Sequence, residues 1–387
     1  MTTTMFAGFS SLFGFGLIVA FLGSIKLVLA MRIGADNAQF GRVIAVFQWI
    51  MVVMAIAGGV TIDLVGHQVA ICAGSLLSAI AISWIGRTRS TPVVLGCCTL
   101  LGIGAQLLYA SGNTLLPSLF ADPSAGSSLG NAVCGLGALL MSIIAAALFK
   151  RMTFERALSL LAFVLLIPLG LALLGTFPAT VRTLGERTFD VTVAVSLLGN
   201  YVLWIAALLL FCYIGLEVSM GAWISSYATE LGADGTQAVH TLSIFWVAMM
   251  VSRLCFGLQD QLTGIQLTPV GGTLLVVAGL TALVALTMLM RSRNLQSAQV
   301  WIFVVGFVFG PIFPTTIGIT LEHFAPSTWG TLFGVVATAG SVGAALIPPW
   351  IGRKSTTRTM QASFGILRST AFGVTAIALI LALLPAM

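Results

Sequence analysis

One carboxylate, Glu217, stands well inside an apolar stretch at residues 211–232 that is long enough to cross a membrane. A charge near the middle of a bilayer costs about 2.5–3.5 kcal/mol on insertion scales, so such a group normally faces a cavity, pairs with a cation or takes up a proton. Desolvation favours the neutral acid, which suits a proton carrier. The alternative is a structural carboxylate that is hydrogen-bonded across helices.

The neighbours of Glu217 fall on two helical faces. Tyr213, Glu217 and Gly221 share one face, and Trp223 and Tyr227 share another. Gly221 is a position at which the helix can bend, as discontinuous helices do at transporter sites. The two aromatic side chains suit stacking against a ligand, and they equally suit the aromatic belt at a membrane surface.

A second polar stripe lies in the segment 92–114. Gln106, Tyr109 and Asn113 fall on one helical face, which predicts that they line a cavity or a partner helix. The two amides both donate and accept hydrogen bonds, as recognition of hydroxyl-bearing solutes requires. Further substrate-binding candidates, each a polar or aromatic side chain in an apolar segment, are Gln48, Trp49, Asn131, Trp246 and Lys26. Lys26 can alternatively reach the membrane surface.

The elements that must position these residues are membrane-spanning helices. Hydrophobic residues make up 58% of the chain and charged residues 7%, with a mean hydropathy of +1.09. A water-soluble domain carries about 25% charged residues, so this class is excluded. About twelve stretches reach the length of roughly 20 residues that a spanning helix needs. They lie near 6–30, 40–60, 69–86, 92–114, 126–149, 156–176, 200–229, 238–258, 268–290, 299–322, 328–350 and 366–385. The chain is predicted to be an all-α polytopic membrane protein.

A short signature occurs twice at equivalent places. Gly59, Asp63 and Gly66 lie between the second and third predicted spans, and Asp260 lies between the eighth and ninth within "FGLQDQLTG". The two aspartates are 260 − 63 = 197 positions apart, about half of the 387 residues. This indicates two six-helix halves, as in transporters with internal repeats. We expect an N-terminal half at 1–176, a central linker at 177–199 and a C-terminal half at 200–387.

Three further residues bear on gating. Pro311 and Pro314 fall in the middle of a predicted span, where proline removes backbone hydrogen bonds and permits a kink. Arg253 lies near a span end beside Asp260, and a structural pair at that junction is the favoured interpretation over a binding role. The kink suggests a gating motion, although a rigid structural kink explains the prolines nearly as well.

On these motifs the sequence resembles the major facilitator superfamily, over nearly the whole chain. Within that superfamily it looks like the branch of fucose–proton symporters and sodium- or proton-linked glucose carriers. The matching stretches include "GIGAQLLYASGN", "YIGLEVSMGAWISSYA" and "FGPIFPTTIGIT". The loop signature is degraded, because Thr61 replaces a leucine and His67 and Gln68 replace a basic pair. The acidic residues of the fucose symporter in its first and fourth spans are also absent, since Gly23 or Ser24 and Tyr109 stand there.

The resemblance implies a secondary transporter of a small polar, sugar-like solute that works by alternating access. If transport is coupled to an ion, with a proton preferred over sodium, Glu217 is the residue that would carry it. Alternatively the protein is a facilitator, which needs no titrating group. The alternatives are an exporter of amphipathic drugs, organic anions or metabolites, and a non-transporting membrane sensor or scaffold. We expect no enzymatic activity, no cofactor, no metal and no nucleic-acid partner, and a monomer in the lipid bilayer of the cell (inner) membrane.

The orientation of the chain is predicted differently by two rules. The superfamily places both termini in the cytoplasm. Fourteen of the seventeen Lys and Arg residues cluster around the odd-numbered connections, which that orientation puts outside, against the positive-inside rule. We favour the orientation of the superfamily, because the loop signature is placed equivalently in both halves.

Overall fold

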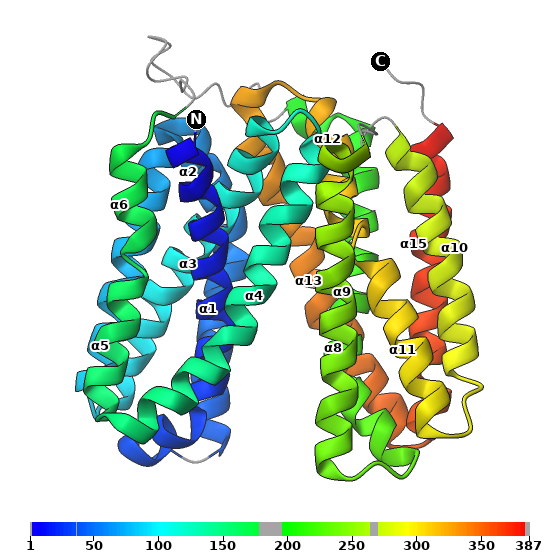
Figure 1. Cartoon of the computed structure of the whole chain (residues 1–387), viewed down its shortest axis with the longest axis horizontal. Coiled ribbons are helices and arrows are strands. Elements are labelled where there is room, and N and C mark those ends of the chain that lie inside the picture. The colour runs from blue at the N-terminus through cyan, green and yellow to red at the C-terminus, as the bar shows by residue number, and fades with distance from the viewer. Residues whose placement is uncertain (1, 36, 178–195, 264–269, 384–387) are drawn as a thin grey trace. The chain divides into compact units, whose positions relative to one another are not determined.

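The computed structural model of the chain describes residues 2–35, 37–177, 196–263 and 270–383. These residues form α-helices joined by short connections, and the described ranges contain no strand (Figure 1). The first helices are α1 (Thr2–Ile33), α2 (Asn37–Arg87), α3 (Thr91–Leu119), α4 (Pro123–Arg151), α5 (Phe154–Val164) and α6 (Ile167–Leu174). The others are α8 (Tyr201–Glu230), α9 (Gly235–Thr263), α10 (Gly271–Leu289), α11 (Leu295–Phe309), α12 (Ile312–Glu322), α13 (Trp329–Ser355), α14 (Met360–Ser363) and α15 (Gly365–Leu383).

Within the described residues, eleven helical segments are long and apolar enough to cross a membrane. One of them, α2, runs over 51 residues and is kinked at Gly66, where φ is 86° and ψ is 165°. Glycine is suited to this position because a positive φ is unfavourable for a residue with a side chain. The kink lies between the second and third predicted spans, so α2 accounts for both. The prediction of an all-α polytopic membrane protein is confirmed.

The chain divides into two compact units. The first contains Met1–Leu119, Val133–Ala194 and Pro326–Gly334, and the second contains Phe120–Ala132, Val195–Ala325 and Val335–Met387. The beginning of α4 is therefore packed in the second unit and the beginning of α13 in the first. The predicted linker at 177–199 falls, over residues 178–195, outside the described residues.

Each unit is a bundle of neighbouring helices. In the first, α1 packs on α3 and α6, and α2 packs on α3 and α5 (Figure 1). In the second, α8 contacts α9, α12 and α15, and α10 contacts α11 and α15. Glycines let α8 and α13 approach closely, because a Cβ built on Gly343 would lie 2.0 Å from the carbonyl oxygen of Phe211.

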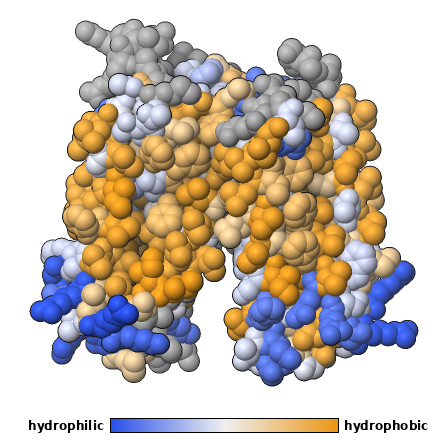
Figure 2. Space-filling model, in the orientation of Figure 1, coloured by the Kyte–Doolittle hydropathy of each residue, from blue (hydrophilic) through white to orange (hydrophobic). Residues whose placement is uncertain are grey.

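The surface of each unit has the distribution expected of a bilayer protein. Large apolar side chains are exposed along the helices, among them Leu208, Val277 and Phe372. In Figure 2 the hydrophilic residues gather at one end of each unit, below a broad apolar band. The basic residues Arg87 and Arg89 lie at the α2–α3 connection, and Arg353, Lys354 and Arg358 lie at the end of α13. Hydrocarbon covers exposed apolar side chains of this kind, and the charges remain at its edge.

Candidate functional site

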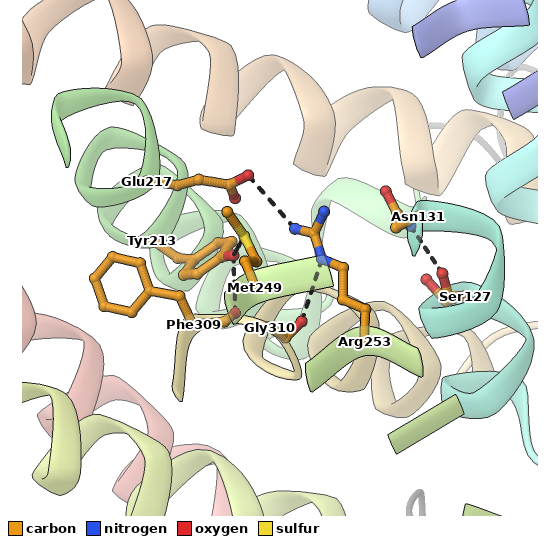
Figure 3. A network of polar contacts seen from close by, with 8 residues as sticks. All are labelled: Ser127, Asn131, Tyr213, Glu217, Met249, Arg253, Phe309 and Gly310. Carbon is orange, nitrogen blue, oxygen red and sulfur yellow. Dashed lines mark hydrogen bonds and ion pairs between the residues drawn. The ribbon is translucent and has the colours of Figure 1, made fainter. Parts of the chain in front are cut away.

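The predicted intramembrane acid has a cationic partner in the second unit. Glu217 of α8 accepts from Arg253 of α9, with 3.4 Å between Oε1 and Nη2 (Figure 3). The two side chains are 17% and 11% exposed. Charges in a poorly hydrated setting are rarely left alone, because a buried ion costs several kcal/mol unless it is paired. Within the described residues of this unit, Glu217 and Arg253 form the ion pair that joins α8 to α9.

The arginine also contacts a break in a helix. The helix α11 ends at Phe309, and α12 begins at Ile312. Pro314 has no N–H to donate to the carbonyl four residues earlier, that of Gly310. Arg253 supplies a donor instead, with 3.4 Å from Nε to the carbonyl oxygen of Gly310 (Figure 3). One guanidinium thus joins the carboxylate on α8 to the break between α11 and α12.

Tyr213, one helical turn before Glu217, contacts the same break. Its side chain is fully buried, and its hydroxyl donates to the carbonyl oxygen of Phe309 at 2.9 Å. The hydroxyl also lies 3.9 Å from the sulfur of Met249, and the ring meets the Phe309 ring edge-on. These contacts indicate that Tyr213 holds α8 against the end of α11. Its role as a ligand contact stays a prediction.

The other aromatic candidates of this unit lie at helix contacts. Trp223 donates to the carbonyl of Pro348 at 3.0 Å, and Tyr227 donates to that of Leu289 at 2.6 Å. Trp246 is 42% exposed and lies over Gly221, where an added Cβ would come within 2.8 Å of the indole. Of the three, Trp246 has the most surface free for a solute.

Asn131 lies in the part of α4 that belongs to the second unit. Its side chain is buried and donates to the carbonyl of Ser127 at 2.9 Å. In Figure 3 both residues are on the other side of Arg253 from Glu217. The sequence suggested Asn131 only as an isolated polar residue, whereas the structure brings it into the surroundings of the ion pair.

The polar stripe of α3 is buried in the first unit. Tyr109 stacks on Phe15, with 4.2 Å between ring centroids, and Asn113 donates to the carbonyl of Tyr109 at 3.0 Å. Gln106 is 3% exposed, and its amide makes no hydrogen bond within the described part of the chain. An amide without a protein partner in a buried setting is available to a ligand or a water molecule. Of the remaining candidates, Gln48 and Trp49 are exposed and Lys26 is half-buried.

The loop signature forms a second polar site, separate from the ion pair. Asp63 is buried and accepts three hydrogen bonds from the start of α13. They come from Gly330 N at 2.8 Å, Thr331 N at 2.6 Å and Thr331 Oγ1 at 2.6 Å. A helix N-terminus presents unpaired N–H groups, so a carboxylate is stabilised there. Gly59 permits the approach, since a Cβ on it would lie 2.0 Å from the carbonyl oxygen of Gly330.

The expected pair of Arg253 with Asp260 is not described, because the side chain of Asp260 lies outside the described residues. The pair of Arg253 with Glu217 was missed by the sequence analysis. One signal could have found it: two opposite charges, on adjacent spans, in segments that otherwise lack charge. The contacts to the carbonyls of Phe309 and Gly310 had only an indirect signal, the prolines at 311 and 314.

The fold defines a multi-pass α-helical membrane protein. Residues 4–348 match the model of the Major Facilitator Superfamily, so the chain belongs to that family. The structure resembles the crystal structure of the E. coli fucose:proton symporter FucP, with a TM-score of 0.77 at 15% identity over 96% of this chain and 97% of that one. It also resembles the proton:xylose symporter XylE bound to 6-bromo-6-deoxy-D-glucose, with a TM-score of 0.73 at 13% identity over 97% of this chain and 94% of that one.

At these identities the likeness concerns the fold. A curated relative, Bypass of stop codon protein 6 of Saccharomyces cerevisiae, is 28% identical over 166 residues. That match covers 39% of this chain and 32% of the yeast protein. The predicted family is confirmed, and a family of transporters fits the expectation that the chain is not an enzyme.

The contacts of Asp63 predict a stability effect. Asp63→Asn keeps the shape of the side chain but turns one acceptor into a donor that faces an N–H group. We expect a loss of about 1–3 kcal/mol in the free energy of unfolding, the usual consequence of leaving a buried polar group unsatisfied. Thermal unfolding of the purified protein in detergent measures it. Thr331→Val, which removes only the hydroxyl bond, should cost about 1 kcal/mol. An Asp63→Asn protein as stable as the wild type would contradict the assignment.

Proposed function

We propose that this protein carries a small polar solute, sugar-like in its hydroxyl groups, across the membrane by alternating access, and that Glu217 carries a coupling proton. The observation that supports this most is the ion pair of Glu217 with Arg253 beside the break between α11 and α12. A titratable acid beside an interruption in the hydrogen bonds of a spanning helix can link the binding of an ion to a conformational change.

Protonation gives the pair two states. The ionised carboxylate of Glu217 accepts from Arg253. A proton on Glu217 removes the charge that holds the guanidinium. Arg253 also donates to Gly310, so its release alters the support of the break at the same time. Proton binding at α8 is thereby coupled to the geometry of α11 and α12, the element on which we place a gating role for Pro311 and Pro314.

The solute class is supported by the buried amide of Gln106. It offers a donor and an acceptor and has no hydrogen-bond partner within the described residues, which suits the hydroxyl groups of a sugar. Structural likeness to a fucose:proton and a proton:xylose symporter favours the same class. The partially exposed indole of Trp246 supplies a surface for the apolar face of a ring. In this proposal the chain consists of two six-helix halves, divided at 177–199, which move relative to each other during transport.

Replacing the acid tests the coupling. Glu217→Gln keeps the hydrogen-bonding shape but cannot titrate, so solute accumulation driven by a proton gradient should fall to simple equilibration. Exchange of labelled for unlabelled solute needs no net proton movement and should stay within about threefold of the wild-type rate. Both are measured in proteoliposomes with an imposed pH gradient.

Glu155→Gln is the matched control. Glu155 forms an ion pair with Arg87 on the surface, with both side chains 52% exposed, so its loss should leave both activities unchanged. Equal loss of accumulation and exchange in Glu217→Gln would show that Glu217 binds solute or holds the structure, and would refute the coupling role.

The solute class is tested by thermal stabilisation. A ligand that binds only the folded state adds about 2.7 kcal/mol to the free energy of unfolding at a concentration of one hundred times Kd. The melting temperature therefore rises. We expect stabilisation by a monosaccharide, reduced in Gln106→Leu. Stabilisation by organic anions or amphipathic drugs alone would replace the sugar assignment by the exporter alternative.

We further propose that the chain has the orientation of its superfamily. Both termini then lie in the cytoplasm, and the odd-numbered connections, which carry most of the basic residues, lie outside. A single cysteine at Arg358, an exposed position after α13, should then react in intact cells with a membrane-impermeant maleimide. A cysteine at Ala121, exposed between α3 and α4 at an even-numbered connection, should react only after permeabilisation. The reverse pattern would show that the positive-inside rule, and not the superfamily orientation, holds for this chain.

A further inference from the structure

An apolar groove runs along the second unit between α13 and α15. Its volume is about 510 Å³, and Phe211 and Cys212 of α8 lie along it. One side is formed by Leu346, Ile347 and Trp350 of α13, and the other by α15 from Gly365 to Gly373. The volume is in the range of small-molecule sites. This groove shares no residue with the ion pair of Glu217 and Arg253.

The groove faces the surroundings of the protein. Leu346 is 59% exposed and Trp350 is 63% exposed, so two of its large apolar side chains are open to whatever surrounds the bundle. In a protein of this class the medium around exposed apolar side chains on a spanning helix is hydrocarbon. A tryptophan near a helix end is typical of the level of the lipid headgroups. Acyl chains are therefore the molecules that reach this groove.

One end of the groove carries a cation. Lys354 lines it, and its Nζ lies 4.0 Å from the position that a Cβ on Gly365 would take. Within the described residues, Lys354 has no ion pair and no side-chain hydrogen bond. The nearby hydroxyls of Ser369 and Thr370 already donate to the carbonyls of Gly365 and Ile366. The ammonium group is thus the main free donor of the groove.

The charged residues that line this end of the groove and the neighbouring hollow are all basic. A second, shallower hollow of about 380 Å³ adjoins the groove through Ser369 and is lined by Arg368 and Phe372. The residues lining the two hollows include no acid. The carboxylate of Glu230 is occupied at the start of α14, where it accepts from the N–H groups of Met360 and Gln361. An anion at Lys354 would meet no opposing charge from this lining.

We propose that the groove is a binding site for an anionic phospholipid of the surrounding membrane, with the phosphate at Lys354 and an acyl chain along Leu346, Ile347 and Trp350. An unpaired cation at the headgroup level matches the phosphate of such a lipid, and the apolar channel below it matches the acyl chain. Basic pockets between spanning helices bind the headgroups of acidic lipids in this way. The proposal does not depend on the transported solute or on Glu217.

Lipid affinity of the purified full-length protein tests the proposal. Native mass spectrometry, with dioleoyl phosphatidylglycerol and dioleoyl phosphatidylcholine added separately, gives a Kd for each lipid. The wild type should prefer the anionic lipid. Lys354→Gln should raise the Kd for phosphatidylglycerol about fivefold, which is the contribution of one cation to binding at an anionic membrane surface. The Kd for phosphatidylcholine should not change. Arg353→Gln, which removes the neighbouring exposed cation outside the groove, should leave the preference intact.

A second readout locates the acyl chain. Phosphatidylglycerol brominated in its acyl chains should quench the fluorescence of Trp350, seen as the difference between the wild type and Trp350→Phe. Ser369→Leu should reduce this quenching, because it places a larger side chain in both hollows. Equal affinity of wild type and Lys354→Gln for phosphatidylglycerol would overturn the proposal. So would binding of glycerol phosphate as tight as that of the lipid, which would mean a site for a small anion without a chain.

Discussion

The ion pair of Glu217 and Arg253 is the constraint on which the second unit depends. Two charges that are mostly removed from water have to stay together, because separating them leaves an uncompensated charge at a cost of about 3–5 kcal/mol. The pair links α8 to α9, and another donor of Arg253, its Nε–H, links both to the carbonyl of Gly310. The break between α11 and α12 is then part of the polar site, since Pro314 leaves free the carbonyl of Gly310, which accepts from Arg253.

The first unit satisfies its buried carboxylate by a different means. Asp63 has no cation beside it among the contacts described, and it is compensated by the backbone N–H groups and the hydroxyl at the start of α13. The positive end of a helix dipole offers about half a unit charge, which falls off within one turn. Such a contact is strong while the carboxylate touches the helix end and vanishes after a small displacement. It therefore suits a contact that forms and breaks, whereas the arginine pair keeps an attraction over a longer distance.

Most of the fold was predictable, because hydropathy is a local property and the bilayer fixes the length of each span. The break at Gly310 and the kink at Gly66 were also signalled by single residues whose backbone preferences are unusual. The partners of the polar side chains were not predictable in the same way. Tyr213 was a candidate ligand contact from its spacing, yet its hydroxyl meets the carbonyl of Phe309, 96 positions away. Helical periodicity assigns a side chain to a face, but only the packing of helices decides what that face contacts.

The contrast between paired and unpaired cations connects these sites to the surroundings of the protein. Arg253 lies between helices and has a carboxylate, while Lys354 lies at a groove open to the outside and has no such partner in the described structure. An ammonium group keeps its hydration at the level of the headgroups, so Lys354 is tolerable without a protein anion, and a lipid phosphate can supply one. Arg253 is mostly shielded from water and from lipid headgroups, so a change in the charge of Glu217 has to be compensated by another group of the protein or by a ligand. In the proposed cycle, protonation of Glu217 would remove the negative charge opposite the guanidinium, while Arg253 keeps its hydrogen bond to the carbonyl of Gly310. The hydrogen bond that the ionised carboxylate accepts from Arg253 would weaken, and another oxygen could take its place. In that cycle a solute rich in hydroxyl groups would supply the oxygen, and proton and solute binding would then depend on each other.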